Sequence, residues 1–172
     1  MRTQARESPR ETLQARARRY ARVRELHDAS ARNPVLTFLL GGERYGVEAR
    51  CVLGVARVEH LTPLPSAPGP LAGLVLWRGS ILTVVDLEGP LGAPRVGLDD
   101  RARVVVVRPR STDVGGMDLG ILVGDVEGIL DVGGDLEAPE NESELVAGRA
   151  AGALTVLNPR ALPALLMEGD RR

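Results

Sequence analysis

Apolar and polar residues alternate over several short runs from residue 35 onward, and a period of two is typical of β-strands. The first run, residues 35–40, places Leu36 and Phe38 on one side of an extended chain. Gly41 and Gly42 follow as a turn signal before the run ERYGVEA. The two runs together predict a β-hairpin.

Further short apolar runs predict more strands, at residues 73–76, 81–87, 103–108, 117–123 and 153–157. Clusters of Gly and Pro separate them, at residues 63–70, 89–94, 115–116 and 133–134. Many short strands divided by such turns are typical of small barrels and sandwiches. Only residues 52–58 and 159–167 look helical in this part of the chain, so the pattern predicts an all-β fold.

Before residue 34 the pattern is that of a helix. Residues 11–28 combine good helix formers with no Gly or Pro, and Asn33 and Pro34 close the segment. The sequence therefore predicts an N-terminal basic helix with its hinge at residues 1–33 and a β-rich domain at residues 34–172. At 172 residues the chain is near the size of one ordinary domain.

The formal net charge is −1 at pH 7, which gives no field that would attract nucleic acid or an anionic membrane to the whole protein. The charges are unevenly distributed, because residues 1–32 hold nine arginines and residues 125–144 hold eight acids and no base. Every basic residue is Arg, which we interpret as a compositional habit of the source genome. The acids do not follow the spacing of a calcium loop, so they predict a solvated loop rather than a metal site.

Catalytic motifs are missing from the sequence. His27 and His60 are the only histidines and have no neighbours at metal-ligand spacing, and the single cysteine, Cys51, reads as a small apolar residue. With no lysine, a phosphate loop of the usual kind cannot form. We therefore expect no catalytic residue, no metal and no cofactor. No secretory leader and no 18-residue apolar span is recognisable, so we expect a cytoplasmic protein without membrane insertion.

Four blocks in sequence resemble the CheW-like domain family, the adaptor module of bacterial chemotaxis. They read FLLGGERYGVEA, PLPSAPGPLAGLVLWRGSILTVVDL, GILVGDVEGIL and LVAGRAAGALTVLNPRALPALL. The first is similar to the family's opening hairpin, the second to its central signature with an LRG-type turn, and the last two to its second half and terminal helix. The resemblance covers about three quarters of the chain, from Val35 to Leu166.

This resemblance implies a fold of two packed five-stranded β-barrels with a shared apolar core and a short C-terminal helix. It also implies a non-catalytic adaptor that couples chemoreceptors, the methyl-accepting chemotaxis proteins, to a CheA-type histidine kinase. The implied partners are the regulatory domain of that kinase and the cytoplasmic tip of the receptor. A location at receptor arrays near the inner membrane is compatible with the expected cytoplasmic one.

The candidate protein-binding residues lie around an arginine that joins two apolar runs. By resemblance, Arg78 corresponds to the family's signature arginine, and Gly79 permits close backbone approach. The guanidinium either orders a binding surface through its planar fork of donors or caps the barrel as a structural residue. The full set of candidates is Arg78, Trp77, Gly79, Val52, Val55 and Val123.

The sequence departs from the family pattern close to these candidates. The family usually has Asn-Leu before the Arg-Gly pair, where this chain has Leu76 and Trp77. It usually has Glu at the position of Gly54.

Two other functions stay open beside the adaptor. One is a barrel-based module that binds a peptide or ligand outside chemotaxis, and the other is nucleic-acid binding through the N-terminal arginines. The second is the weaker, because only three aromatic residues follow the helix to stack on bases.

Overall fold

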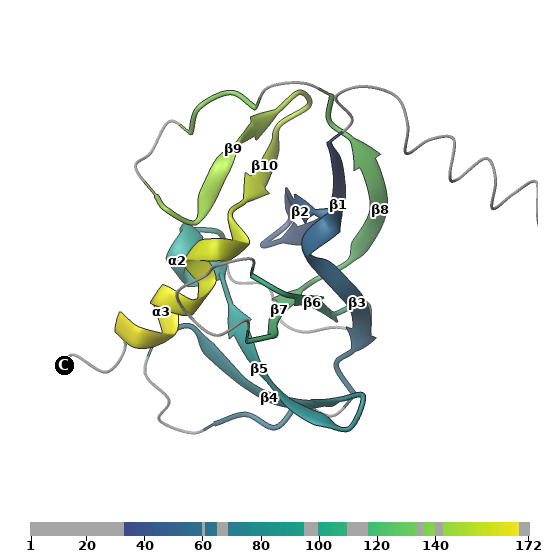
Figure 1. Ribbon diagram of the computed structural model, residues 1–172, viewed down its shortest axis with the longest axis vertical. Coiled ribbons are helices and arrows are strands. Elements are labelled where there is room, and N and C mark those ends of the chain that lie inside the picture. The colour runs from purple at the N-terminus through teal and green to yellow at the C-terminus, as the bar shows by residue number, and fades with distance from the viewer. Residues whose placement is uncertain are drawn as a thin grey trace, which may run out of the picture. The chain divides into compact units, whose positions relative to one another are not determined.

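A computed structural model describes residues 33–59, 61–64, 69–94, 100–109, 117–133, 136–139 and 143–168. The predicted N-terminal helix and both histidines lie outside the described residues. The described part forms two five-stranded sheets with few helical turns, so the predicted all-β class is confirmed. Figure 1 shows the strands of both sheets.

The first sheet combines strands from both ends of the domain, in the order β8-β1-β2-β10-β9. Its strands are β1 Pro34–Leu40, β2 Glu43–Glu48, β8 Val126–Asp131, β9 Val146–Ala150 and β10 Leu154–Leu157. The predicted hairpin is present, with β1 antiparallel to β2 and Phe38 opposite Tyr45. Strand β10 lies parallel to β2, with Thr155 opposite Tyr45. The C-terminal part of the chain therefore returns to complete a sheet that residues 34–48 begin.

The second sheet is contiguous in sequence and has the order β3-β6-β7-β5-β4. Its strands are β3 Val52–Arg57, β4 Leu71–Trp77, β5 Ser80–Asp86, β6 Arg103–Val107 and β7 Leu119–Val123. A short 3-10 helix, η1 Ala49–Cys51, connects β2 to β3. The second sheet is thus inserted between β2 and β8 of the first sheet.

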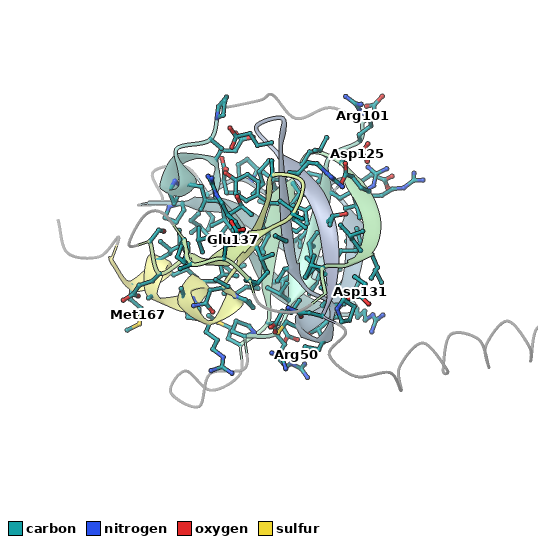
Figure 2. All side chains as sticks on the ribbon, turned by 90° about the horizontal axis from the view of Figure 1, so that it is seen from above. Arg50, Arg101, Asp125, Asp131, Glu137 and Met167 are labelled. Carbon is teal, nitrogen blue, oxygen red and sulfur yellow. The ribbon has the colours of Figure 1, made fainter. Side chains whose placement is uncertain are left out.

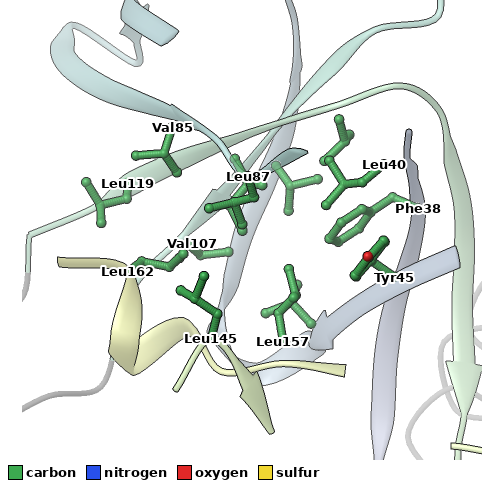
Figure 3. Packing of buried hydrophobic residues seen from close by; sticks show 14 of the residues in the cluster. Phe38, Leu40, Tyr45, Val85, Leu87, Val107, Leu119, Leu145, Leu157 and Leu162 are labelled. Atoms are coloured by element: carbon green, nitrogen blue, oxygen red, sulfur yellow. The ribbon is translucent and has the colours of Figure 1, made fainter. Parts of the chain in front are cut away.

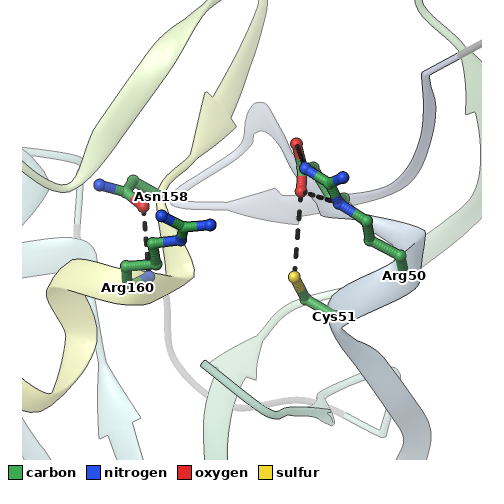
Figure 4. A network of polar contacts seen from close by, with 5 residues as sticks. Arg50, Cys51, Asn158 and Arg160 are labelled. Carbon is green, nitrogen blue, oxygen red and sulfur yellow. Dashed lines mark hydrogen bonds and ion pairs between the residues drawn. The ribbon is translucent and has the colours of Figure 1, made fainter. Parts of the chain in front are cut away.

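Three short helical segments complete the described fold: α2 Glu88–Leu91, η2 Pro159–Ala161 and α3 Leu162–Glu168. The last two confirm the predicted C-terminal helix. The side chain of Asn158 caps the N-terminus of this segment, because its Oδ1 accepts a hydrogen bond of 3.2 Å from the backbone N–H of Arg160 (Figure 4). Leu162 at the start of α3 is buried against both sheets.

Buried side chains gather in three clusters. The largest, which we call the shared core, joins the two sheets and includes Phe38 and Leu40 of β1, Val85 of β5 and Val107 of β6 (Figure 3). A second cluster lies within the second sheet and takes residues from all five of its strands. A third lies in the first sheet around Val35. The expected pair of five-stranded units with an apolar core between them is therefore confirmed.

The prediction of a helix at residues 52–58 is wrong. These residues form β3, which pairs antiparallel with β6 and places Val55 opposite Val105. The segment contains helix-compatible residues, but its β-branched valines suit a strand and the pairing with β6 satisfies its backbone. Local propensity is a weak guide where a neighbouring strand supplies hydrogen bonds.

The prediction of a solvated loop at residues 125–144 is also wrong in part, because residues 126–131 form β8. This strand ends the sheet order and pairs with β1. Its acids point outward, and Glu127 accepts hydrogen bonds of 3.0 and 2.8 Å from Arg44 of β2. Charged residues are common on edge strands, so acidity alone did not exclude a strand here.

Replacing Phe38, which is fully buried in the shared core, by Ala should lower the free energy of unfolding by about 3–5 kcal/mol because it leaves a cavity. The shared core joins both sheets, so fluorescence of Trp77 in β4 should show the same lowered midpoint as far-UV circular dichroism. Ile81→Ala, at a position 76% exposed, is the control and should change stability by about 0.5 kcal/mol or less. An unshifted Trp77 signal in Phe38→Ala would show that the sheets unfold separately.

Candidate functional site

The candidate arginine occupies the tightest kind of hairpin turn. Trp77 pairs with Ser80 across β4 and β5, which leaves Arg78 and Gly79 as a two-residue loop. Their φ angles are +48° and +85°, so both residues adopt the left-handed conformations of a type I′ turn. Asn, Asp and Gly are preferred at the first position of such a turn, and an L-residue with a long side chain costs backbone energy there. Arg78 is therefore a poor choice for the turn itself.

The guanidinium of Arg78 stacks on the adjacent indole. Its central carbon lies 4.9 Å from the centroid of the Trp77 ring, within the range of a cation–π interaction. The residue is exposed, and the described part of the chain offers it no side-chain hydrogen bond or ion pair. The fork of donors that was expected to hold carbonyls or a carboxylate thus faces outward from the stack. This placement fits a surface contact better than a buried structural anchor.

Trp77 connects the turn to the interior of the second sheet. Its side chain is partly buried and packs against the cluster that contains Val75 and Leu82. The ring also reaches Gly54 of β3, where an added Cβ would lie 2.9 Å from the ring atom Cη2. Since β3 and β4 stand at opposite ends of the sheet order, this contact brings the two end strands together.

Two apolar side chains flank the turn on the outer face of the hairpin. Leu76 and Ile81 are directly opposite each other across β4 and β5, and they are 68% and 76% exposed. Neither was among the predicted binding residues. Strand alternation could have found them, because the neighbouring Val75 and Leu82 point into the second cluster.

The remaining candidates do not all lie on this surface. Val55 of β3 is 39% exposed and follows Gly54, so it lies at the same end strand that Trp77 contacts. Val52 is partly buried against the shared core. Val123 of β7 is only 2% exposed within that core, and its side chain has no surface to offer a partner. The structure therefore brings together Arg78, Trp77, Gly79 and the neighbourhood of Val55, and separates Val123 from them.

Titratable groups with shifted pKa values lie away from the turn. Burial raises the pKa of Tyr45, with the Glu43 carboxylate adding to the effect, and Asp118 raises the pKa of Arg108 through their paired hydrogen bonds. The buried thiol of Cys51 lies 3.9 Å from Oε2 of Glu48, which Arg50 also contacts (Figure 4). These groups form ordinary ion pairs and hydrogen bonds, and none adjoins the Arg78 turn in sequence.

The described residues contain neither a metal-holding cluster nor a membrane-spanning helix. No group of three or more His, Cys, Asp or Glu in the described ranges could hold a metal ion. No helix there has the length and apolar character needed to span a bilayer. Figure 2 shows Arg50, Arg101 and Met167 at the periphery of the domain, where their polar or flexible ends reach solvent.

Comparisons with known proteins agree with the fold. Chemotaxis protein CheW of Bacillus subtilis strain 168 is 24% identical over 81 residues, which cover 47% of this chain and 52% of that protein. The chain thus spans about half the length of this relative. Chemotaxis protein CheW of Rhizobium meliloti strain 1021 is 26% identical over 132 residues, 76% of this chain and 82% of that protein.

The crystal structure of the scaffolding protein TtCheW from Thermoanaerobacter tengcongensis has the same fold. It matches with a TM-score of 0.66 and 22% identity, covering 79% of this chain and 90% of that chain. A family model described as the CheW-like domain matches residues 34–165, most of the chain. The resemblance seen in the sequence is confirmed, and the chain belongs to the CheW-like domain family.

Proposed function

We propose that this protein is a non-catalytic adaptor of a chemotaxis-type signalling pathway, which couples chemoreceptors to a CheA-type histidine kinase in the cytoplasm. Its partners would be the regulatory domain of the kinase and the cytoplasmic tip of a receptor. Membership of the CheW-like domain family and the names of the relatives, chemotaxis proteins and a scaffolding protein, support this proposal. The same support favours the adaptor over a ligand-binding module outside chemotaxis.

The Arg78 turn is the observation that carries the proposal. An exposed arginine stands at a φ of +48°, where a shorter residue would be more stable, and strained positions of this kind gather at functional sites. Its donors face solvent from an aromatic platform, and the exposed pair Leu76 and Ile81 lies beside them. An arginine next to an apolar patch is a common composition for the centre of a protein interface.

The chemistry of contact follows from these groups. Burial of Leu76 and Ile81 against a partner removes apolar area from water, which favours association. The guanidinium of Arg78 can donate two parallel hydrogen bonds to a carboxylate or to backbone carbonyls of the partner, which fixes orientation. Such a surface binds a protein and needs no reactive group, in accord with a scaffold.

Substitution of Arg78 should separate binding from stability. Arg78→Ala and Arg78→Lys should weaken binding to the kinase regulatory domain or the receptor fragment by about 1–3 kcal/mol, Ala at least as much as Lys, because an ammonium lacks the planar fork. Arg78→Asn should weaken binding as well, yet unfold at an equal or higher denaturant concentration, since Asn tolerates a positive φ. Isothermal titration calorimetry and chemical denaturation on the same variants measure both quantities.

Arg160→Ala is the matched control, because Arg160 is an exposed arginine on η2, outside the second sheet. It should bind both partners like the wild type. Wild-type affinity in all three Arg78 variants would show that this turn is not a binding site. Recovery of neither partner by the wild-type protein would instead favour a different kind of ligand for the fold.

Absence of intrinsic turnover is a second expectation. The sequence shows no nucleophile–base pair, phosphate loop or metal-ligand set, so the purified protein should neither hydrolyse ATP nor phosphorylate itself. A phosphate-release assay with the protein alone, and a kinase assay with CheA-type kinase added, would measure this. The kinase rate should change with the adaptor present. Turnover by the protein alone that a point substitution abolishes would end the scaffold proposal.

A further inference from the structure

Gly54 and Trp77 fit together in a way that leaves no space for any other side chain. A Cβ placed on Gly54 would lie 2.9 Å from Cη2 and 3.0 Å from Cζ2 of the Trp77 ring, a separation that real Cβ atoms rarely reach. The ring therefore occupies the volume that a side chain at residue 54 would need. Any larger residue at this position must displace the indole.

Backbone geometry does not explain this glycine. Gly54 is absent from the glycines with positive φ, so an alanine could adopt its conformation without strain. It lies in β3, next to a register shift between Val52 and Gly54, and pairs with Val106. A glycine inside a strand weakens it, because it has no side chain to pack and more freedom to lose. The position of the Trp77 ring therefore explains why residue 54 is a glycine.

The ring in turn supports the arginine of the turn. The guanidinium carbon of Arg78 lies 4.9 Å from the centroid of the Trp77 ring. Within the described part of the chain, this stack is the side-chain interaction that Arg78 makes. An indole is rigid and has few rotatable bonds, so moving its far edge moves the surface on which Arg78 rests. A contact made on β3 is thus carried to the tip of the β4–β5 hairpin.

We propose that Gly54 is a positioning residue of the partner-binding turn: it seats Trp77, and Trp77 sets where the Arg78 guanidinium stands. This inference rests on the proposed function of the Arg78 turn. The Gly54–Trp77 contact would also make the turn selective, since a fixed guanidinium meets a partner carboxylate in only one place. Two of the positions at which this chain departs from the family pattern, 54 and 77, are then one feature.

The packing of Trp77 against Gly54 is tested by whether a substitution at residue 54 lowers or raises the denaturation midpoint. The same substitution is compared in the wild type and in a Trp77→Leu background. In the wild type, Gly54→Ala and Gly54→Val should lower the denaturation midpoint measured by far-UV circular dichroism, because the ring is displaced. In Trp77→Leu, whose shorter side chain frees the space, Gly54→Ala should leave the midpoint unchanged or raise it, since the strand loses a flexible glycine. An equal fall in both backgrounds would overturn the packing argument.

Fluorescence gives a direct reading of the ring, because Trp77 is the only tryptophan in the chain. In Gly54→Val the emission maximum should move to longer wavelength as the ring loses burial. Gly124→Ala is the matched control: its φ is not positive, and the nearest atom to its Cβ would be the Leu39 carbonyl oxygen at 3.4 Å. An unshifted emission maximum in Gly54→Val would show that the ring does not depend on Gly54.

Binding separates a positioning role from a merely structural one. With folded protein and the kinase regulatory domain or receptor fragment, Gly54→Val should weaken binding by about 3- to 30-fold, a coupling typical of contacting residues. In an Arg78→Ala background the same substitution should have no further effect, because there is no guanidinium left to position. An equal loss in both backgrounds would overturn the role. If the wild type binds neither partner, the proposed function fails, and denaturation and fluorescence still decide whether Gly54 seats the ring.

Discussion

The apolar core shared between the two sheets is the interaction on which the rest of the structure depends. Strands β1 and β2 of the first sheet and β5, β6 and β7 of the second bury side chains in it, and Leu162 adds the start of α3. Each sheet also has its own smaller cluster, built around Val35 in one and Val84 in the other. Because a small five-stranded unit buries too little apolar surface alone, the shared core makes one stable domain of the two.

The candidate site lies outside the shared core but depends on it for a fixed position. The Arg78 turn projects from a hairpin whose other end is fixed by Val85 in the shared core. At the exposed end, Trp77 meets Gly54 and ties the two end strands of the second sheet. The strained arginine is thus held by a framework that can sustain a locally unfavourable backbone. The function proposed for this turn therefore relies on packing on both sides of it.

Strands with plain alternation or a strong apolar run were predictable from sequence, as the β1–β2 hairpin and β6 show. Strand β3 was not, because the valines of residues 52–58 stand among helix formers and only pairing with β6 decides the conformation. The turn at Arg78 was found because a charge stood between two apolar runs. The contact between Gly54 and Trp77 was not predictable from the sequence, since it joins two strands that do not pair with each other.

The strands of the second sheet lie between β2 and β8 in the sequence, so the ribosome synthesises the whole second sheet before the first sheet is complete. All five strands of the second sheet have left the ribosome before β8, β9 and β10 exist, so that unit has its full set of partners first. Completion of the first sheet must wait, because β10 pairs with β2 over a separation of more than a hundred residues. During that interval β1 lacks β8, the strand that pairs with its other edge. A nascent chain of this protein therefore exposes the apolar side chains of β1 until β8 and β10 have been synthesised.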